Sequence, residues 1–243
     1  MKAYKVVILI LILCYCLLWI GGIVSYLFLC GPPSESQWTA PLFLCLAGTL
    51  ALTLTAPNYR LPLAACGLIG LAVEIAGVHL GIPFGRYVYT QELQPFVLGV
   101  PIAIGCAWLV LFAYVKQMLQ IGGIPAPWQY LCGAFWMVSL DLLIDPLASG
   151  PLGYWIWAKE GWYHGVPLMN FLGWFVVSLA LFLIFRNPWP HRMGVVQVGF
   201  SIVIFFALIA LARGIIGALL AGIGLILFHG WVFWRNRSRD NGL

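Results

Sequence analysis

Residues 139–146 read Ser-Leu-Asp-Leu-Leu-Ile-Asp-Pro and place two carboxylates inside an otherwise apolar segment. Asp141 and Asp145 are four residues apart, so they share one face if the segment is a helix. The surrounding segment, 128–147, is long and apolar enough to cross a membrane. Charged side chains are costly in such a helix and commonly mark function. The stretch therefore predicts a membrane helix that carries a site.

The composition of the whole chain predicts the same class of protein. Its 243 residues are 63% hydrophobic and 8% charged, whereas about 25% of the residues in a soluble domain are charged. We therefore expect an all-α, polytopic membrane helix bundle, formed as one domain over 1–243, with the lipid bilayer as its surroundings. The net charge of +5 forms no basic patch, which argues against nucleic acid as a partner.

Apolar runs separated by turn residues predict about eight transmembrane helices. Six of these runs cover 6–29, 41–55, 61–80, 96–115, 128–147 and 166–185. The first is too long for a signal-peptide core and lacks a small-x-small cleavage site, so we expect a retained span. The last run, 195–234, exceeds one span of about 20 residues. Arg213-Gly214 in its middle predicts a hairpin between two helices, although seven spans are the alternative.

The basic residues predict the orientation of these spans. With eight spans, one side receives Lys2, Lys5, Arg60, Lys116, Arg186, Arg192, Arg235, Arg237 and Arg239, and the other receives Arg86, Lys159 and Arg213. This positive-inside bias predicts a multi-pass protein of the cytoplasmic membrane with both termini in the cytoplasm. Seven spans would move the last three basic residues across the membrane and weaken the bias.

Two blocks of the chain, about 70–115 and 136–185, resemble each other. The first reads Glu74…Gly85-Arg-Tyr-Val-Tyr89…Gly99-Val-Pro101, and the second reads Asp141…Gly153-Tyr-Trp-Ile-Trp157…Gly165-Val-Pro167. Each has a carboxylate late in a span, a glycine-led pair of alternating aromatic residues, and Gly-Val-Pro before the next span. This predicts two parallel helix-loop-helix repeats with a site at their interface. Chance similarity between membrane loops is the alternative.

Glu74, Asp141 and Asp145 are the candidate catalytic residues. Burial disfavours an ionised carboxylate, and an acid that stays neutral near pH 7 can donate a proton as a general acid. The structural alternative is that Asp141 bonds a neighbouring helix and that Asp145 caps an exposed helix end beside Pro146. Three acids close to a cluster of aromatic residues favour the functional interpretation.

The loops supply candidate substrate-binding residues. Their aromatic side chains are Tyr87, Tyr89, Tyr154, Trp155, Trp157, Trp162 and Tyr163. These rings are either an interfacial aromatic belt or the lining for a long apolar ligand whose positive charge they can stabilise. His164 can bond a hydroxyl group or water, or lie in solvent. Asn170 must find a partner inside its span, which is either an oriented water or a neighbouring helix.

The sequence predicts no metal site and no cofactor. Its cysteines, Cys14, Cys16, Cys30, Cys45, Cys66, Cys106 and Cys132, form no CxxC pair and are interpreted as small buried apolar residues. The four histidines are scattered along the chain. Glycine-rich nucleotide loops, a G-x-S-x-G elbow and a DDxxD-type pattern are all missing from the sequence.

The two blocks resemble the CruF-type carotenoid 1,2-hydratase family, also called the membrane carotenoid biosynthesis protein family. In the first block the matching pattern is Glu74-x-x-Gly77-x-x-x-Gly81-x-Pro-Phe-Gly85-x-Tyr87-x-Tyr89, followed by Gly99-Val-Pro101 and Trp108. In the second it is Asp141-x-x-x-Asp145-Pro146, Gly153-x-Trp155-x-Trp157, Gly161-x-Tyr163-x-Gly-Val-Pro167, Asn170-Phe and Gly173-Trp174. The resemblance covers about 70–175, and His164 departs from the aromatic residue expected there.

The resemblance implies addition of water to the terminal 1,2 double bond of a linear carotenoid ψ end group. A carboxylic acid would protonate the alkene, the rings would stabilise a tertiary cation, and water would attack it. Of Asp141 and Asp145, one is assigned as the acid, and the other, or Glu74, as the base. Tyr87, Tyr89, Trp155, Trp157, Tyr163, His164 and Asn170 would bind the substrate. No cofactor is implied, and other membrane enzymes of the carotenoid pathway are expected as partners.

Two other functions stay open at this point. A small transporter or carotenoid-binding protein would use the carboxylates as proton relays and the aromatic loops as a gate. An end-group cyclase or isomerase would share the protonation step and differ in how the cation is quenched.

Overall fold

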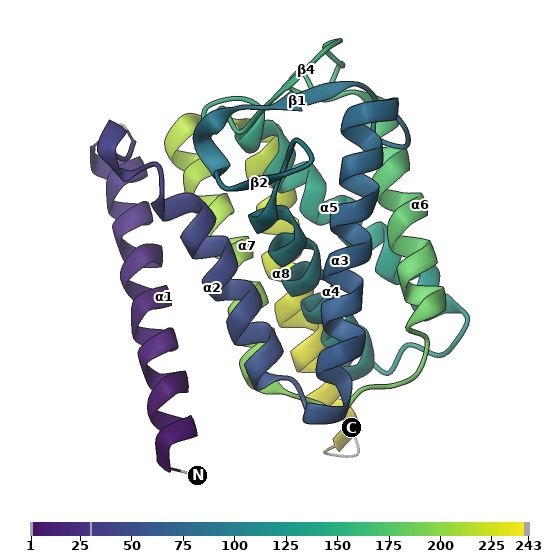
Figure 1. Ribbon diagram of the computed structural model, residues 1–243. Coiled ribbons are helices and arrows are strands. Elements are labelled where there is room, and N and C mark those ends of the chain that lie inside the picture. Colours follow the sequence, from purple (N-terminus) through teal and green to yellow (C-terminus); the bar gives the residue numbers. More distant parts are fainter. Residues whose placement is uncertain (1, 30, 241–243) are drawn as a thin grey trace.

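The computed structural model is an all-α bundle typical of a multi-pass membrane protein, as the composition predicts (Figure 1). It describes the backbone of residues 2–29 and 31–240 and the side chains of 4–29, 31–33 and 35–238. Cys30 lies outside the described residues, as do the side chains of Lys2 and Arg239 that enter the charge count. Among the described residues, six helices are long and apolar enough to span a membrane, and two more are apolar but shorter.

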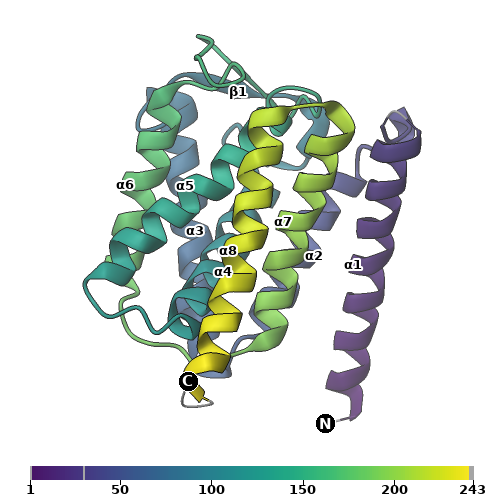
Figure 2. The ribbon, with the colours of Figure 1, turned by 180° about the vertical axis from the view of Figure 1, so that it is seen from behind.

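Within 2–29 and 31–240 the chain forms eight α-helices. They are α1 (Lys2–Phe28), α2 (Thr39–Leu54), α3 (Pro57–Leu80), α4 (Ile102–Ile121), α5 (Trp128–Ala148), α6 (Leu168–Ile184), α7 (Met193–Arg213) and α8 (Ile216–Asp240). The expected hairpin between the last two helices is present, and Gly214 turns it with a φ of 67°. The described ends of the chain lie at the same end of the bundle, as an even number of spans requires (Figures 1 and 2).

The predicted start of the fourth span at residue 96 is wrong. Residues 96–101 form a short hairpin of β2 (Phe96–Val97) and β3 (Val100–Pro101), and α4 begins after it. Leu98 and Gly99 turn the hairpin with positive φ angles of 47° and 81°. That conformation suits a two-residue hairpin turn and cannot belong to a right-handed helix. The apolar character of these residues concealed the turn.

Helix α4 is the centre of the bundle, and α2, α3, α5 and α7 pack around it. Its side chains are almost all buried, from Ala103 to Ile121. Close approach depends on small residues on the surrounding helices. A Cβ atom on Gly70 of α3 would lie 2.4 Å from Cγ of Trp108, so only glycine leaves room for this indole ring.

Helix α1 stands at the edge of the bundle in both views (Figures 1 and 2). The Tyr15 hydroxyl lies 2.7 Å from Oγ of Ser201, and the Trp19 indole donates to the Ser201 carbonyl at 2.9 Å. Cys14 and Cys16 are exposed on this helix, so the prediction that the cysteines are buried is wrong for them. They face outward because α1 packs only through one side.

The aromatic loops of the two blocks pair directly with each other. Strand β1 (Tyr87–Tyr89) is antiparallel to β4 (Trp155–Trp157), with Tyr87 opposite Trp157 and Tyr89 opposite Trp155. This aromatic ribbon, β1 and β4 together, closes the end of the bundle opposite the chain ends (Figure 1). Helices α3 and α5 both lead into it, so the blocks meet at the point where their carboxylates lie.

Candidate active site

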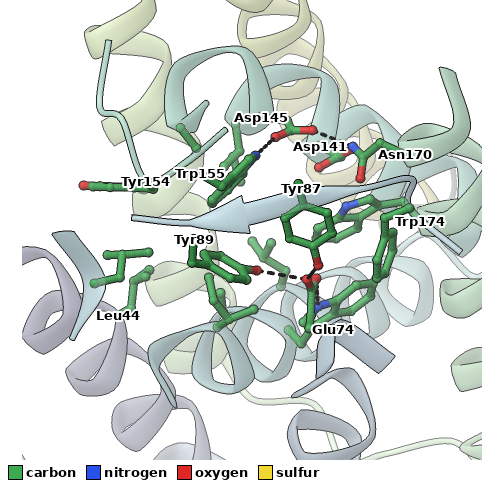
Figure 3. Close-up of a pocket in the computed structure, with 18 of the residues that line it drawn as sticks. Leu44, Glu74, Tyr87, Tyr89, Asp141, Asp145, Tyr154, Trp155, Asn170 and Trp174 are labelled. Atoms are coloured by element: carbon green, nitrogen blue, oxygen red, sulfur yellow. Dashed lines mark hydrogen bonds between the residues drawn. The ribbon is translucent and has the colours of Figure 1, made fainter. Parts of the chain in front are cut away.

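A cavity of about 70 Å³ lies beneath the aromatic ribbon (Figure 3). Alternation along the strands turns Tyr87, Tyr89, Trp155 and Trp157 toward the cavity. The residues between them face outward: Val88 is 58% exposed and Ile156 is 59% exposed. The lining also includes Glu74, Asp141, Asp145 and Asn170. The structure therefore brings eight of the ten predicted site residues to one chamber.

Glu74, on the last part of α3, is buried and surrounded by hydrogen-bond donors. Both the Tyr87 hydroxyl and the Tyr89 hydroxyl donate to its Oε2, the latter at 2.9 Å. The Trp108 indole donates to Oε1 at 3.0 Å. Three described side chains thus satisfy the two oxygens of one carboxylate, an arrangement that suits a single negative charge.

The two tyrosines of β1 act as donors because they stay protonated. Burial, together with the neighbouring Glu74 charge, raises the pKa of Tyr87 and of Tyr89 above the ordinary value for a phenol. Each hydroxyl keeps its proton at neutral pH and directs it at the carboxylate. Both phenols are therefore neutral hydrogen-bond donors to Glu74.

Trp108 and Trp174 complete the half of the chamber that contains Glu74. Their rings stack at 4.1 Å between centroids with an interplanar angle of 14°. Both residues occur in the family pattern but were not among the predicted site residues. An indole in the middle of an apolar span is the signal that could have identified them, because such a ring needs a partner for its N–H group.

Asp141 and Asp145 lie side by side on α5, and both are buried. The Asn170 amide nitrogen donates to Oδ2 of Asp141 at 2.6 Å and to Oδ2 of Asp145 at 2.5 Å. The Trp155 indole donates to Oδ1 of Asp145 at 2.7 Å. The alternative that Asp145 caps an exposed helix end is wrong, because Pro146 lies inside α5 and the helix continues to Ala148.

This second half has fewer donors than carboxylate oxygens. Among the described residues, Oδ1 of Asp141 accepts no hydrogen bond. The partners of Asp145 occupy both of its oxygens. Asp141 therefore has the carboxyl oxygen that is available for a ligand in the chamber.

Tyr163 and His164 do not line the chamber. The Tyr163 hydroxyl donates to the Leu142 carbonyl at 3.0 Å, and its ring meets Phe171 edge-on. His164 has a positive φ of 49° and packs against Gly217 of α8. Tyr163 therefore contacts α5 and α6, and His164 contacts α8, away from the lining of the chamber.

Several residues that line the chamber were not predicted from the sequence, because they belong to generic apolar helices. Leu44 of α2 and Ile202 and Phe206 of α7 contribute to the wall. Their positions follow from helix packing, and the sequence carries no local signal for them. Within the described part of the chain, no group of three or more His, Cys, Asp or Glu residues is arranged to hold a metal ion.

Comparison with known proteins identifies the family of the chain. Residues 39–230 match the family described as carotenoid biosynthesis protein. The chain belongs to this family. A family relative, the bisanhydrobacterioruberin hydratase of Haloarcula japonica, is 33% identical over 130 residues, which cover 51% of this chain and 44% of that protein. No solved structure matches the chain.

Proposed function

We propose that this carotenoid biosynthesis protein is a carotenoid 1,2-hydratase that adds water to the terminal double bond of a linear ψ end group. The observation that carries the proposal is the convergence of Glu74, Asp141 and Asp145 on one aromatic chamber inside a membrane bundle. The name of the Haloarcula relative supports hydration as the reaction type. The matched region is less than half of that relative, so the chemistry is argued from the residues themselves.

The aspartate pair supplies the proton. Two negative charges that share the Asn170 amide would repel each other in an apolar site, so the pair holds one proton. Asp141, with its open oxygen, gives this proton to C2 of the double bond, and the π electrons form the new C–H bond. A tertiary cation remains at C1, and Asp141 becomes the anion.

Glu74 and the surrounding rings stabilise that cation. In this mechanism Glu74 is the anion: Tyr87, Tyr89 and Trp108 donate hydrogen bonds to it, and its charge would face the chamber before the reaction begins. The faces of Trp155 and Trp157 add cation–π attraction. These groups offset the cost of making a positive charge in an apolar site.

Water completes the reaction. It attacks C1, and Asp145 accepts the proton that the water releases, so one C–O bond forms and the product is a tertiary alcohol. The pair again holds one proton, and transfer from Asp145 to Asp141 restores the starting state. The carbonyl of Asn170, whose nitrogen is engaged with both aspartates, is positioned to orient the water.

We also propose that the protein lies in the cytoplasmic membrane with both termini in the cytoplasm. The positive-inside bias supports this orientation. The chamber then lies in the non-cytoplasmic half of the membrane. A reporter fused after residue 240 should be active in its cytoplasmic form, and activity of a periplasmic reporter at that position would reverse the orientation.

The deciding experiment is pigment analysis in a host that makes lycopene and γ-carotene. Wild type should yield a product heavier by one water, and Asp141→Asn should abolish it at equal protein level in the membrane. Glu160→Gln is the matched control, because this exposed loop carboxylate lies outside the chamber. A product of unchanged mass would overturn hydration in favour of isomerisation or cyclisation. An unchanged pigment profile would favour a carrier.

A further inference from the structure

A second, larger cavity of about 560 Å³ adjoins the chamber. Its walls come from α1, α2 and α7 and from the loops near them. Three residues line both cavities: Leu44 of α2, Tyr154 after α5, and Phe206 of α7. In Figure 3, Leu44 and Tyr154 lie at the end of the chamber away from Asn170 and Trp174. The two spaces therefore share a wall at this junction.

Judged by the volumes of the two cavities, a long substrate would lie partly in the chamber and partly outside it. Ligand pockets usually measure about 300–1,000 Å³, so the 70 Å³ chamber admits only the end of a long molecule. The remainder must leave the chamber, and a space of suitable size lies on the other side of the junction.

The walls of the second cavity suit an apolar chain. Near α1, α2 and α7 they include Leu18, Phe43 and Phe205. Leu17, in the same wall, is 70% exposed, so the cavity reaches the lipid-facing surface of α1. Polar groups gather toward the loops, where Gln37 donates to Glu92 at 3.1 Å. The apolar wall near α1 and α2 thus extends from the junction toward the bilayer, and the charged residues Glu92 and Arg213 line the cavity near the loops.

Hydrogen bonds fix the position of Tyr154 at the junction. The amide of Tyr154 donates to the Ala148 carbonyl at 2.7 Å, and the Thr90 amide donates to the Tyr154 carbonyl at 3.0 Å. The Tyr154 side chain is also hydrogen-bonded to Tyr26 of α1. Tyr154 is therefore held between the aromatic ribbon and α1, with its ring at the passage.

We propose that the cavity between α1, α2 and α7 binds the conjugated chain of the carotenoid next to the reacting end group, and that Leu44, Tyr154 and Phe206 form the passage. This inference rests on the proposed hydration and deepens it, because it makes α1 part of the substrate site. Specificity for a long polyene would then be decided in the second cavity and the chemistry in the chamber.

Gly21 of α1 offers a direct test. It lines the second cavity, and a Cβ atom there would meet nothing within 4 Å. Gly21→Phe should fill the cavity without touching the carboxylates. Gly230→Phe on α8 is the matched control, because Gly230 also has open space around it and does not line either cavity. Ala40→Phe on α2 fills the same cavity from the opposite wall.

With purified protein and lycopene, Gly21→Phe and Ala40→Phe should each raise KM about tenfold and leave kcat unchanged, while Gly230→Phe behaves as wild type. Lycopene binding to the Asp141→Asn protein, followed by quenching of tryptophan fluorescence, should weaken by the same factor. Unchanged KM and unchanged binding in both cavity variants would overturn the inference. If wild type forms no hydrated product, the proposed function fails, and the binding titration still tests the cavity.

Discussion

The two halves of the chamber hold their carboxylates in opposite ways. In the first, Glu74 receives three donors from Tyr87, Tyr89 and Trp108. In the second, Asp141 and Asp145 share one amide, and one indole is added. A carboxylate rich in donors is stabilised as an anion, whereas a crowded pair relieves its repulsion by keeping a proton. In the proposed mechanism, similar blocks of sequence therefore serve as a charge stabiliser and as a proton donor.

The sharpest contrast between the halves comes from converting each acid to its amide. Asp141→Asn should lower kcat about 10³-fold, because general acid catalysis contributes roughly 10²–10⁴-fold. Asp145→Asn should have a similar effect because it removes the acceptor for the water's proton. The rate of formation of the hydrated carotenoid by purified enzyme measures both. Full activity in either variant would remove that residue from proton transfer.

Glu74→Gln should have a smaller effect, about 10²-fold on kcat. The amide keeps the shape of the side chain and loses the negative charge that faces the cation. The same kinetic assay measures it, with Glu160→Gln as the control for losing an exposed carboxylate. A loss larger than that of Asp141→Asn would exchange the roles assigned to the two halves.

Removing the indole donor from each half of the chamber is expected to change the stability of the protein by different amounts. Trp108→Phe should lower the free energy of unfolding by about 2–3 kcal/mol, since it loses a buried hydrogen bond and leaves a cavity beside Trp174. Trp155→Phe should cost about 1 kcal/mol, because Trp155 is only half-buried on a strand. Thermal unfolding in detergent compares them. Equal melting temperatures would mean that the ribbon is as important for stability as the helix core.

The smallest effect is expected on the outer face of the aromatic ribbon. Val88 and Ile156 face each other across the strands and point away from the chamber. Val88→Thr and Ile156→Thr should each change kcat/KM by less than about twofold. A large loss from either would show that the outward face of the ribbon also contacts the substrate.

Most of the site could be predicted because its residues are unusual for their surroundings. Glu74, Asp141, Asp145 and Asn170 are polar groups in apolar spans, and such groups need partners. The alternating aromatic residues of the two blocks pair as β1 and β4 and turn one face toward the chamber. Tyr163 and His164 lie in the same loop region, yet they contact α5, α6 and α8 outside the chamber, because proximity in sequence does not decide which neighbours a loop residue meets.

The sequence by itself determined the membrane bundle, its eight helices and the acids inside it, because hydrophobic length and costly charge are local properties of a chain. Only the tertiary structure decided the strand register that sets Tyr87 against Trp157. It likewise decided which donors bond to which of the three carboxylates, and that α2 and α7 contribute to the wall of the chamber. It also decided that α4 begins after a hairpin of apolar residues. These features depend on contacts between distant segments, and apolar side chains in a membrane protein carry almost no information about which neighbour they will meet.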